Sequence, residues 1–196
     1  MSKPVIVQSD KTLLLEVDNP QFENARNAIS QFSELEKSPE HIHTYRITPL
    51  SLWNAAASGL DADKIIVNLS RYSKYDIPDT VHTTIKEQMQ RYGLLKLVMS
   101  GDDLVLTSRD PALINEILYN KKLQNYVIER RGENNLVVKK IFRGHIKQAL
   151  IKIGFPVEDL AGYEEGDPCS ISIRLPESTG TGLEFRDYQL SAVDAF

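Results

Sequence analysis

The amino-acid sequence predicts an α+β protein organised in two modules. Residues 5–7 and 13–17 are apolar and partly β-branched, and they flank Ser9-Asp10-Lys11, which is the composition of a β-hairpin. A second hairpin pattern surrounds Ser100-Gly101-Asp102, after a series of segments with apolar residues at helical spacing. The pattern changes after Lys122, so we place the boundary between the two modules there.

The first module should contain several short helices. Asn19-Pro20 is typical of a helix start, and the apolar stripe that follows consists of Phe22, Ala25, Ile29 and Phe32. Residues 41–47 alternate between polar and apolar side chains and predict a short strand.

Three further helices are expected before the second hairpin. They begin at Thr48-Pro49, at Asp61 and at Ile77-Pro78, and the first and third end at Gly59 and Gly93. Three short helices followed by a hairpin are typical of a winged-helix module, so the first module is predicted to be winged-helix-like. Another short helix should begin after the hairpin, at Asp110.

The second module should be a small α/β unit. Residues 125–131 and 134–140 predict two strands, and residues 143–153 predict a helix that ends at Gly154. A last strand is expected over residues 170–175, followed by a linker of small and polar residues.

Composition restricts the possible classes of protein. The 196 residues are 41% hydrophobic and 26% charged, no apolar run approaches the length of a membrane span, and no secretory signal is visible at the N-terminus. Cys169 is the single cysteine, so neither a disulfide framework nor a cysteine metal cluster is expected. These observations predict a cytoplasmic protein without membrane contact.

The distribution of charge is uneven. Residues 130–152 contain one acid, Glu133, among seven basic residues, which gives this basic segment a charge of +6. The whole chain carries −4, so the remaining residues carry −10. A basic segment in an acidic protein favours contact with nucleic-acid phosphates. The predicted DNA-binding residues are Arg130, Arg131, Lys139, Lys140, Arg143, Lys147 and Lys152.

Other candidate sites favour structural interpretations. His41 and His43 share one strand face, but no third metal ligand lies nearby, so we expect a hydrogen-bonded pair and no metal. Trp53 should belong to the core, and the aromatic and basic mixture at residues 71–75 should be an ordinary helix end. No G-x-x-x-x-G-K-[ST] phosphate loop and no catalytic arrangement are present, so we expect no catalytic residues and no ATP hydrolysis by this chain alone.

Several stretches, taken in order, resemble the N-terminal region of the XPB family of DNA repair helicases. HIHTYRITPLSLWNAAASGL is similar to a family stretch with the pattern His-x-His-x-Tyr, and KPVIVQSDKTLLLEVDNPQFENAR is similar to the opening hairpin and helix. LSRYSKYDIP, RYGLLKLV and GFPVEDLAGYEEG follow in the family's order. LEFRDYQLSAVDAF resembles the motif just upstream of the Walker A loop. The likeness covers essentially the whole chain and is stronger to the compact prokaryotic form.

The resemblance implies a role for each part. Residues 1–122 would be a regulatory and interaction domain, residues 123–176 a damage-recognition-like domain, and residues 177–196 a linker with the start of the first motor domain. Arg186 and Gln189 would belong to the motif that recognises the adenine of ATP, although Asp187 stands where the family usually has proline. The sequence would then stop before the Walker A motif.

The parent protein implied by this resemblance is an ATP- and Mg²⁺-dependent 3′–5′ DNA helicase or translocase of nucleotide excision repair. Its partners would be duplex or forked DNA and a nuclease or other repair protein. Two alternatives remain open. The chain could be a protein-interaction module, with DNA held only by motor domains, or a stand-alone winged-helix regulator, which the unfinished helix at the end of the sequence disfavours.

Overall fold

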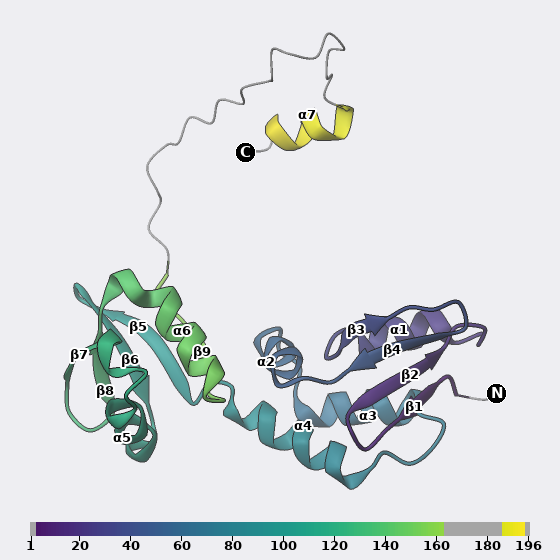
Figure 1. The fold of residues 1–196 in the computed structure, drawn as a ribbon, viewed down its shortest axis with the longest axis horizontal. Helices are drawn as coiled ribbons and strands as arrows, with labels where there is room; N and C mark the ends of the chain where they lie inside the picture. Colours follow the sequence, from purple (N-terminus) through teal and green to yellow (C-terminus); the bar gives the residue numbers. More distant parts are fainter. Residues whose placement is uncertain (1–2, 163–185, 195–196) are drawn as a thin grey trace. The chain divides into compact units, whose positions relative to one another are not determined.

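The computed structural model describes residues 3–162 and 186–194. Residues 1–162 form one compact unit and residues 163–196 a second unit, of which the helix α7 (Asp187–Asp194) is described. The first unit contains two sheets and two hydrophobic cores, so the predicted α+β class is confirmed (Figure 1).

The first sheet has four antiparallel strands in the order β1-β2-β4-β3. β1 (Val5–Val7) and β2 (Thr12–Glu16) are the predicted hairpin, and β4 (Ile42–Arg46) is the predicted strand over residues 41–47. β3 (Glu34–Lys37) was not predicted, because all four of its side chains are exposed and show no alternation of burial.

Four helices complete the first core. They are α1 (Phe22–Ile29), α2 (Pro49–Ala57), α3 (Ala62–Tyr72) and α4 (Asp79–Arg91). α1 packs against β2 and α3, while α2 and α3 pack against α4 (Figure 1). The predicted caps are present, since the side chain of Thr48 accepts from Ser51 N–H and that of Asp61 from Lys64 N–H.

The start and the end of α1 differ from the prediction. The helix begins at Phe22, because the Asn19 side chain forms a turn by accepting from Gln21 N–H at 2.9 Å. It ends at Ile29, and Phe32 is fully buried from the loop that leads to β3. The apolar stripe therefore identified Ala25, Ile29 and Phe32 correctly as buried, while Phe22 is only partly buried, and it overestimated the length of the helix.

The second sheet has five strands in the order β7-β8-β6-β5-β9. β5 (Leu95–Ser100), β6 (Asp103–Ser108), β7 (Val127–Arg130) and β8 (Asn135–Val138) are antiparallel, and β9 (Val157–Asp159) pairs parallel to β5. Two helices, α5 (Pro111–Tyr119) and α6 (Arg143–Lys152), contribute to its core, and the 3₁₀ turns η1 (Gln124–Tyr126) and η2 (Lys140–Phe142) connect the elements.

This sheet takes strands from both sides of residue 122. The hairpin β5–β6 lies at its centre, between β8 and β9, and is not a peripheral wing on a helical module. The winged-helix-like description is therefore not confirmed, and the functional division at residue 122 remains a prediction. The strand expected over residues 170–175 and the linker after it lie outside the described residues.

Candidate nucleic-acid interface

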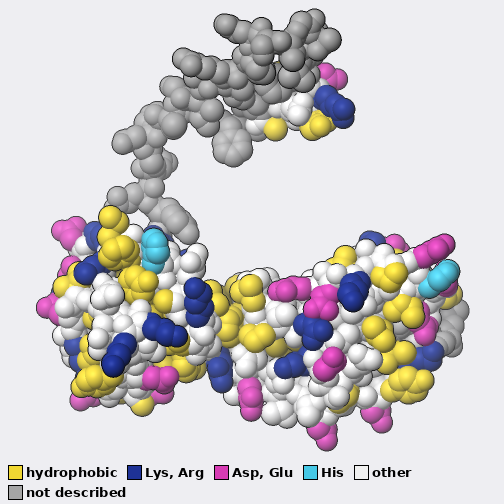
Figure 2. Space-filling model, in the orientation of Figure 1, with side chains coloured by type: hydrophobic (Ala, Val, Ile, Leu, Met, Phe, Trp, Pro, Cys, Tyr) yellow, Lys and Arg dark blue, Asp and Glu magenta, His cyan; other side chains and the backbone are white. Residues whose placement is uncertain are grey.

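The basic segment runs from the end of β7, past β8, through the turn η2 and along the helix α6. Ile146 and Leu150 are fully buried and attach α6 to the core, which leaves Arg143 and Lys147 together on another face. Lys and Arg side chains gather, mixed with hydrophobic ones, on the face of this region shown in Figure 2.

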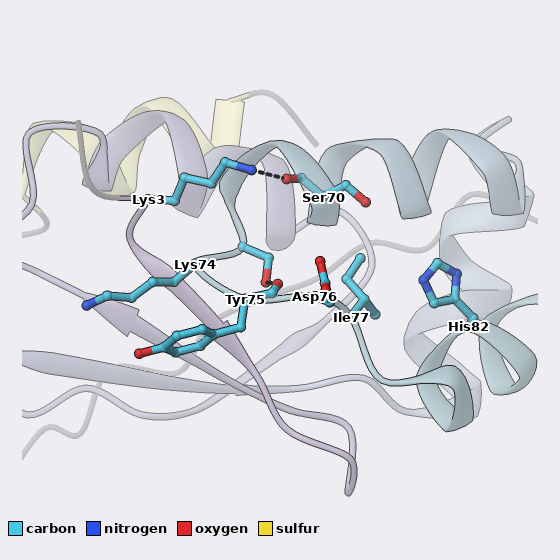
Figure 3. A pocket seen from close by; sticks show the side chains of 8 residues that line it. Lys3, Ser70, Lys74, Tyr75, Asp76, Ile77 and His82 are labelled. Atoms are coloured by element: carbon cyan, nitrogen blue, oxygen red, sulfur yellow. Dashed lines mark hydrogen bonds between the residues drawn. The ribbon is translucent and has the colours of Figure 1, made fainter.

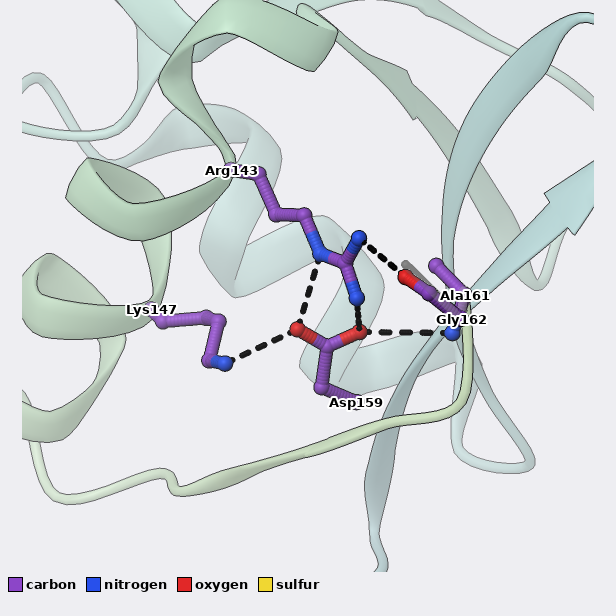
Figure 4. A network of polar contacts seen from close by, with 5 residues as sticks. All are labelled: Arg143, Lys147, Asp159, Ala161 and Gly162. Atoms are coloured by element: carbon purple, nitrogen blue, oxygen red, sulfur yellow. Dashed lines mark hydrogen bonds and ion pairs between the residues drawn. The ribbon is translucent and has the colours of Figure 1, made fainter. Parts of the chain in front are cut away.

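Two of the predicted DNA contacts are joined to a single carboxylate. Arg143 donates from Nε and Nη2 to the two oxygens of Asp159 at 2.9 and 2.7 Å, and Lys147 Nζ donates to the same carboxylate at 2.8 Å (Figure 4). Asp159 comes from β9 and its side chain is 10% exposed. Arg143 also donates to the carbonyl oxygen of Gly162, so this cluster fastens α6 to β9 and the chain that follows.

The Asp159 carboxylate remains ionised down to strongly acidic pH. Burial by itself would raise its pKa, but the hydrogen bonds from Arg143 and Lys147, with a third from Ala161 N–H, lower the pKa from 3.8 to about 2. Two cations and one carboxylate leave a net charge of +1 on this cluster. Arg143 and Lys147 therefore offer less positive charge to a phosphate than the sequence suggested.

The two arginines at the end of β7 also have protein partners. Arg130 donates to the side chain of Asn115 and to the carbonyl oxygens of Gly132 and Glu133. Arg131 pairs with Asp103 at 2.8 Å and with Glu129 at 3.1 Å, and these hydrogen bonds raise the pKa of its guanidinium. Both side chains are exposed, so they can still approach a phosphate from the solvent side.

Three lysines carry the most available charge of the segment. Lys140 and Lys152 are exposed and form no ion pair with another described residue. Lys139 is exposed too. Its Nζ donates to the carbonyl oxygen of Asn125 at 2.9 Å and lies 5.9 Å from the centre of the Phe142 ring, but no described carboxylate pairs with it. The sequence could not show that Asp103 and Asp159 would pair with this segment, because both lie outside residues 130–152 and the fold brings them there. Glu129 directly precedes the segment, two residues before Arg131, so that pair could have been expected on a strand.

The predicted adenine-binding pair lies at the start of α7. The Gln189 side-chain oxygen accepts a hydrogen bond from the backbone N–H of Arg186 at 3.0 Å, as in half of a capping box. Asp187 is the first residue of the helix, where a negative charge favours the helix dipole. The side-chain oxygen of Gln189 therefore caps a helix here. Its role in adenine recognition remains a prediction.

The remaining sequence candidates have structural roles, with one exception. Trp53 is 5% exposed and its indole N–H donates to the carbonyl oxygen of Gln88 at 3.0 Å, as expected for a core residue. His41 Nδ1 lies 3.1 Å from Asp18. His43 Nδ1 is buried and has no hydrogen-bond partner among the described residues, and its ring meets that of Phe22 at 77° with centroids 5.3 Å apart. Only His41 therefore has the hydrogen bond expected of the pair. No metal-binding group of His, Cys, Asp or Glu occurs among the described residues.

A cavity of about 510 Å³ lies beside the aromatic and basic stretch at residues 71–75 (Figure 3). Both of its lysines are occupied, since Lys3 donates to the carbonyl oxygen of Ser70 and Lys74 to the carboxylate of Glu16. Asp76 lines the same cavity and would repel an anion. The structural interpretation of this stretch is thus the better one.

Comparison with known proteins identifies the family. A family model described as the helicase conserved C-terminal domain matches residues 5–132. The DNA 3′-5′ helicase XPB of Mycobacterium tuberculosis is 47% identical over 98% of this chain. The chain belongs to the XPB family of helicases. A second XPB helicase, from Kineococcus radiotolerans, is 45% identical over 98% of the chain.

The match to eukaryotic XPB is weaker. The general transcription and DNA repair factor IIH helicase/translocase subunit XPB of Enterocytozoon bieneusi is 27% identical over 95% of the chain. The chain spans 34% of the length of each of the two bacterial XPB relatives and 30% of this one. The predicted resemblance to XPB is therefore confirmed, and so is the prediction that it is stronger to the prokaryotic proteins. No described helix is long and apolar enough to cross a membrane.

Proposed function

We propose that this chain is the DNA-binding and regulatory N-terminal part of an ATP-dependent 3′–5′ DNA helicase or translocase that acts in nucleotide excision repair. The exposed lysines of the basic segment are the observation that carries the proposal, because Lys140 and Lys152 form no ion pair with a described acid. Phosphate contacts by such side chains position a protein on DNA without reading its sequence.

The family supports the remainder of the proposal. The bacterial relatives are DNA 3′-5′ helicases, and the eukaryotic relative belongs to a DNA repair factor by its name. Hydrolysis of ATP, with Mg²⁺ bound to its phosphates, would supply the energy of the helicase reaction in the parent protein, and Arg186 and Gln189 are assigned to the adenine. The place of this chain at the N-terminal end, and its separation into a regulatory part and a damage-recognition-like part, belong to the proposal as well.

The direct experiment is fluorescence anisotropy of the chain with labelled duplex, forked and single-stranded DNA. We expect affinity to fall linearly with the logarithm of salt concentration, because each phosphate contact releases counterions. A preference for forks would support a role in placing the motor at a junction. Absence of binding to all three DNAs at low salt would contradict the proposal.

A second candidate function is docking of a nuclease or other repair protein. Adjacent cavities of about 470 and 480 Å³ lie beside the N-terminal end of α3, and both are lined by Leu60, Asp61 and Asp63. Each cavity also contains one lysine, Lys86 or Lys64, so its two carboxylates leave a net charge of −1, which would suit a basic protein segment better than DNA. Pulldown with a candidate nuclease, compared between the wild type and Asp63→Lys, would test this alternative.

A further inference from the structure

The turn η2 exposes an isoleucine. Ile141 is 83% exposed, the largest value among the exposed large hydrophobic residues that the structure describes. The nearest apolar residues on either side of it in the chain are less exposed, since Val138 is buried and Phe142 is partly buried. The fold therefore gains almost nothing from an apolar side chain at position 141.

The backbone beneath Ile141 is held firmly. Phe142 makes edge contacts with Tyr126 and His145, each with ring centroids 5.7 Å apart. Lys139 N–H donates to the carbonyl oxygen of Tyr126 at 2.9 Å, and Phe142 N–H to that of Lys139 at 3.0 Å. Because these contacts anchor both ends of η2, Ile141 stands on a preorganised turn.

Two lysines immediately precede the exposed isoleucine. Lys139 and Lys140 are both exposed, and neither is paired with a described carboxylate. An apolar side chain flanked by uncompensated cations fits a polyanion that has an apolar interior. Stacked base pairs between two phosphate backbones have this combination of properties.

We propose that Ile141 is a DNA wedge, which inserts between bases where the duplex is distorted while Lys139 and Lys140 contact the flanking phosphates. This inference rests on the proposed function, because it requires the basic segment to face DNA. Apolar wedges unstack a base step, and the unstacking is cheapest where pairing is already lost. Ile141 should therefore favour mismatched or forked DNA over a matched duplex.

The test compares the wild type with Ile141→Ala on duplexes that carry 2-aminopurine beside a mismatch, at a fork or in a matched position. Fluorescence of the base analogue reports unstacking, and anisotropy reports binding in the same titration. Ile128→Ala is the matched control, because Ile128 is an exposed isoleucine of the same sheet, at 59% exposure. Thermal unfolding of both variants should match that of the wild type.

We expect the wild type and Ile128→Ala to bind mismatched DNA with a rise in fluorescence. Ile141→Ala should lose most of that rise and about ten-fold of the preference for mismatched over matched DNA, with its salt dependence unchanged. An Ile141→Ala variant that retains the fluorescence rise would overturn the wedge and leave the proposed function intact. A loss equal on matched and mismatched DNA would also overturn it. Failure of the wild type to bind any DNA at low salt would refute the proposed function itself.

Discussion

At the scale of single residues, Asp159 determines what two of the predicted DNA contacts can do. Its carboxylate accepts hydrogen bonds from Arg143 and Lys147, and its side chain is 10% exposed. Removing one partner from a largely buried ion pair is costly, because the remaining charges lose their compensation. The same removal would release two cations toward solvent.

Asp159→Asn should therefore have two opposite effects. We expect a loss of about 2–4 kcal/mol in the free energy of unfolding, measured with urea. We also expect tighter binding of duplex DNA at low salt, because loss of the carboxylate raises the net charge of this cluster from +1 to +2. Asp103→Asn is the control for stability, since the Asp103–Arg131 pair is exposed and should contribute less than about 1 kcal/mol. Weaker DNA binding by folded Asp159→Asn would contradict this account.

The depressed pKa of Asp159 also predicts a pH dependence of stability. A carboxyl whose pKa is lower in the folded protein stabilises it above the unfolded value, here 3.8, and this stabilisation disappears as the pH falls toward about 2. The full contribution is about 2 kcal/mol, from about 1.4 kcal/mol per pKa unit. Unfolding measured at pH 5 and pH 2.5 should show a smaller acid-induced loss for Asp159→Asn than for the wild type. An equal loss in both proteins would rule out this role.

At the scale of elements, the sequence indicates where most helices and strands start and end, but it does not indicate every pairing between strands. Local signals predicted α2, α3 and α6 because a capping side chain, a proline or a terminal glycine marks them. β3 and β9 were missed for different reasons. β3 has no buried side chain, and β9 is a three-residue strand that exists only because β5 lies beside it.

The candidate site likewise combines residues that a local pattern places with a partner that no local pattern predicts. Arg143 and Lys147 are four residues apart and therefore share one face of α6, whereas their carboxylate partner comes from a strand that no local pattern predicts. Ile141 is a comparable case, because isoleucine is among the residue types most often buried and no local pattern marks this one as exposed. Ile141 lies on η2, the turn that follows the end of β8, and its exposure is set by the path of this turn.

The capping box of α2 offers a test at this scale. Thr48 and Ser51 exchange hydrogen bonds between their side chains and backbone N–H groups, each at 3.0 Å. Thr48→Ala should lower the free energy of unfolding by about 1 kcal/mol. Thr48→Ser keeps the hydroxyl and should lose less than half as much. Similar losses in both variants would show that the methyl group, not the cap, matters.

At the scale of the whole first unit, Arg91 connects its two cores. It lies at the end of α4, donates to the carbonyl oxygen of Gly154 at 3.2 Å and stacks over Phe155, with its guanidinium carbon 5.6 Å from the ring centroid. Gly154 has φ +87°, and a Cβ there would lie 2.8 Å from the Arg91 guanidinium. The glycine thus serves both the backbone turn and this contact.

Arg91→Ala should weaken the coupling between the cores. We expect calorimetric unfolding to broaden or separate into two transitions, with the first unit losing about 1–2 kcal/mol. Lys86→Ala on the same helix is the control, because Lys86 is exposed and has no described ion pair. A single sharp transition, unshifted by Arg91→Ala, would show that other contacts couple the cores.

DNA binding by the basic segment is the central claim, and its salt dependence is the most direct measurement. The affinity for duplex DNA would be titrated against salt for the wild type, for Lys140→Glu with Lys152→Glu, and for a charge-matched control, Lys37→Glu with Lys86→Glu. The two lysines of the segment should each contribute one phosphate contact, so their replacement should reduce the slope of log affinity against log salt by about 2. The control should retain the wild-type slope. Equal slopes in all three proteins, or equal reductions in both variants, would contradict a DNA interface at this surface.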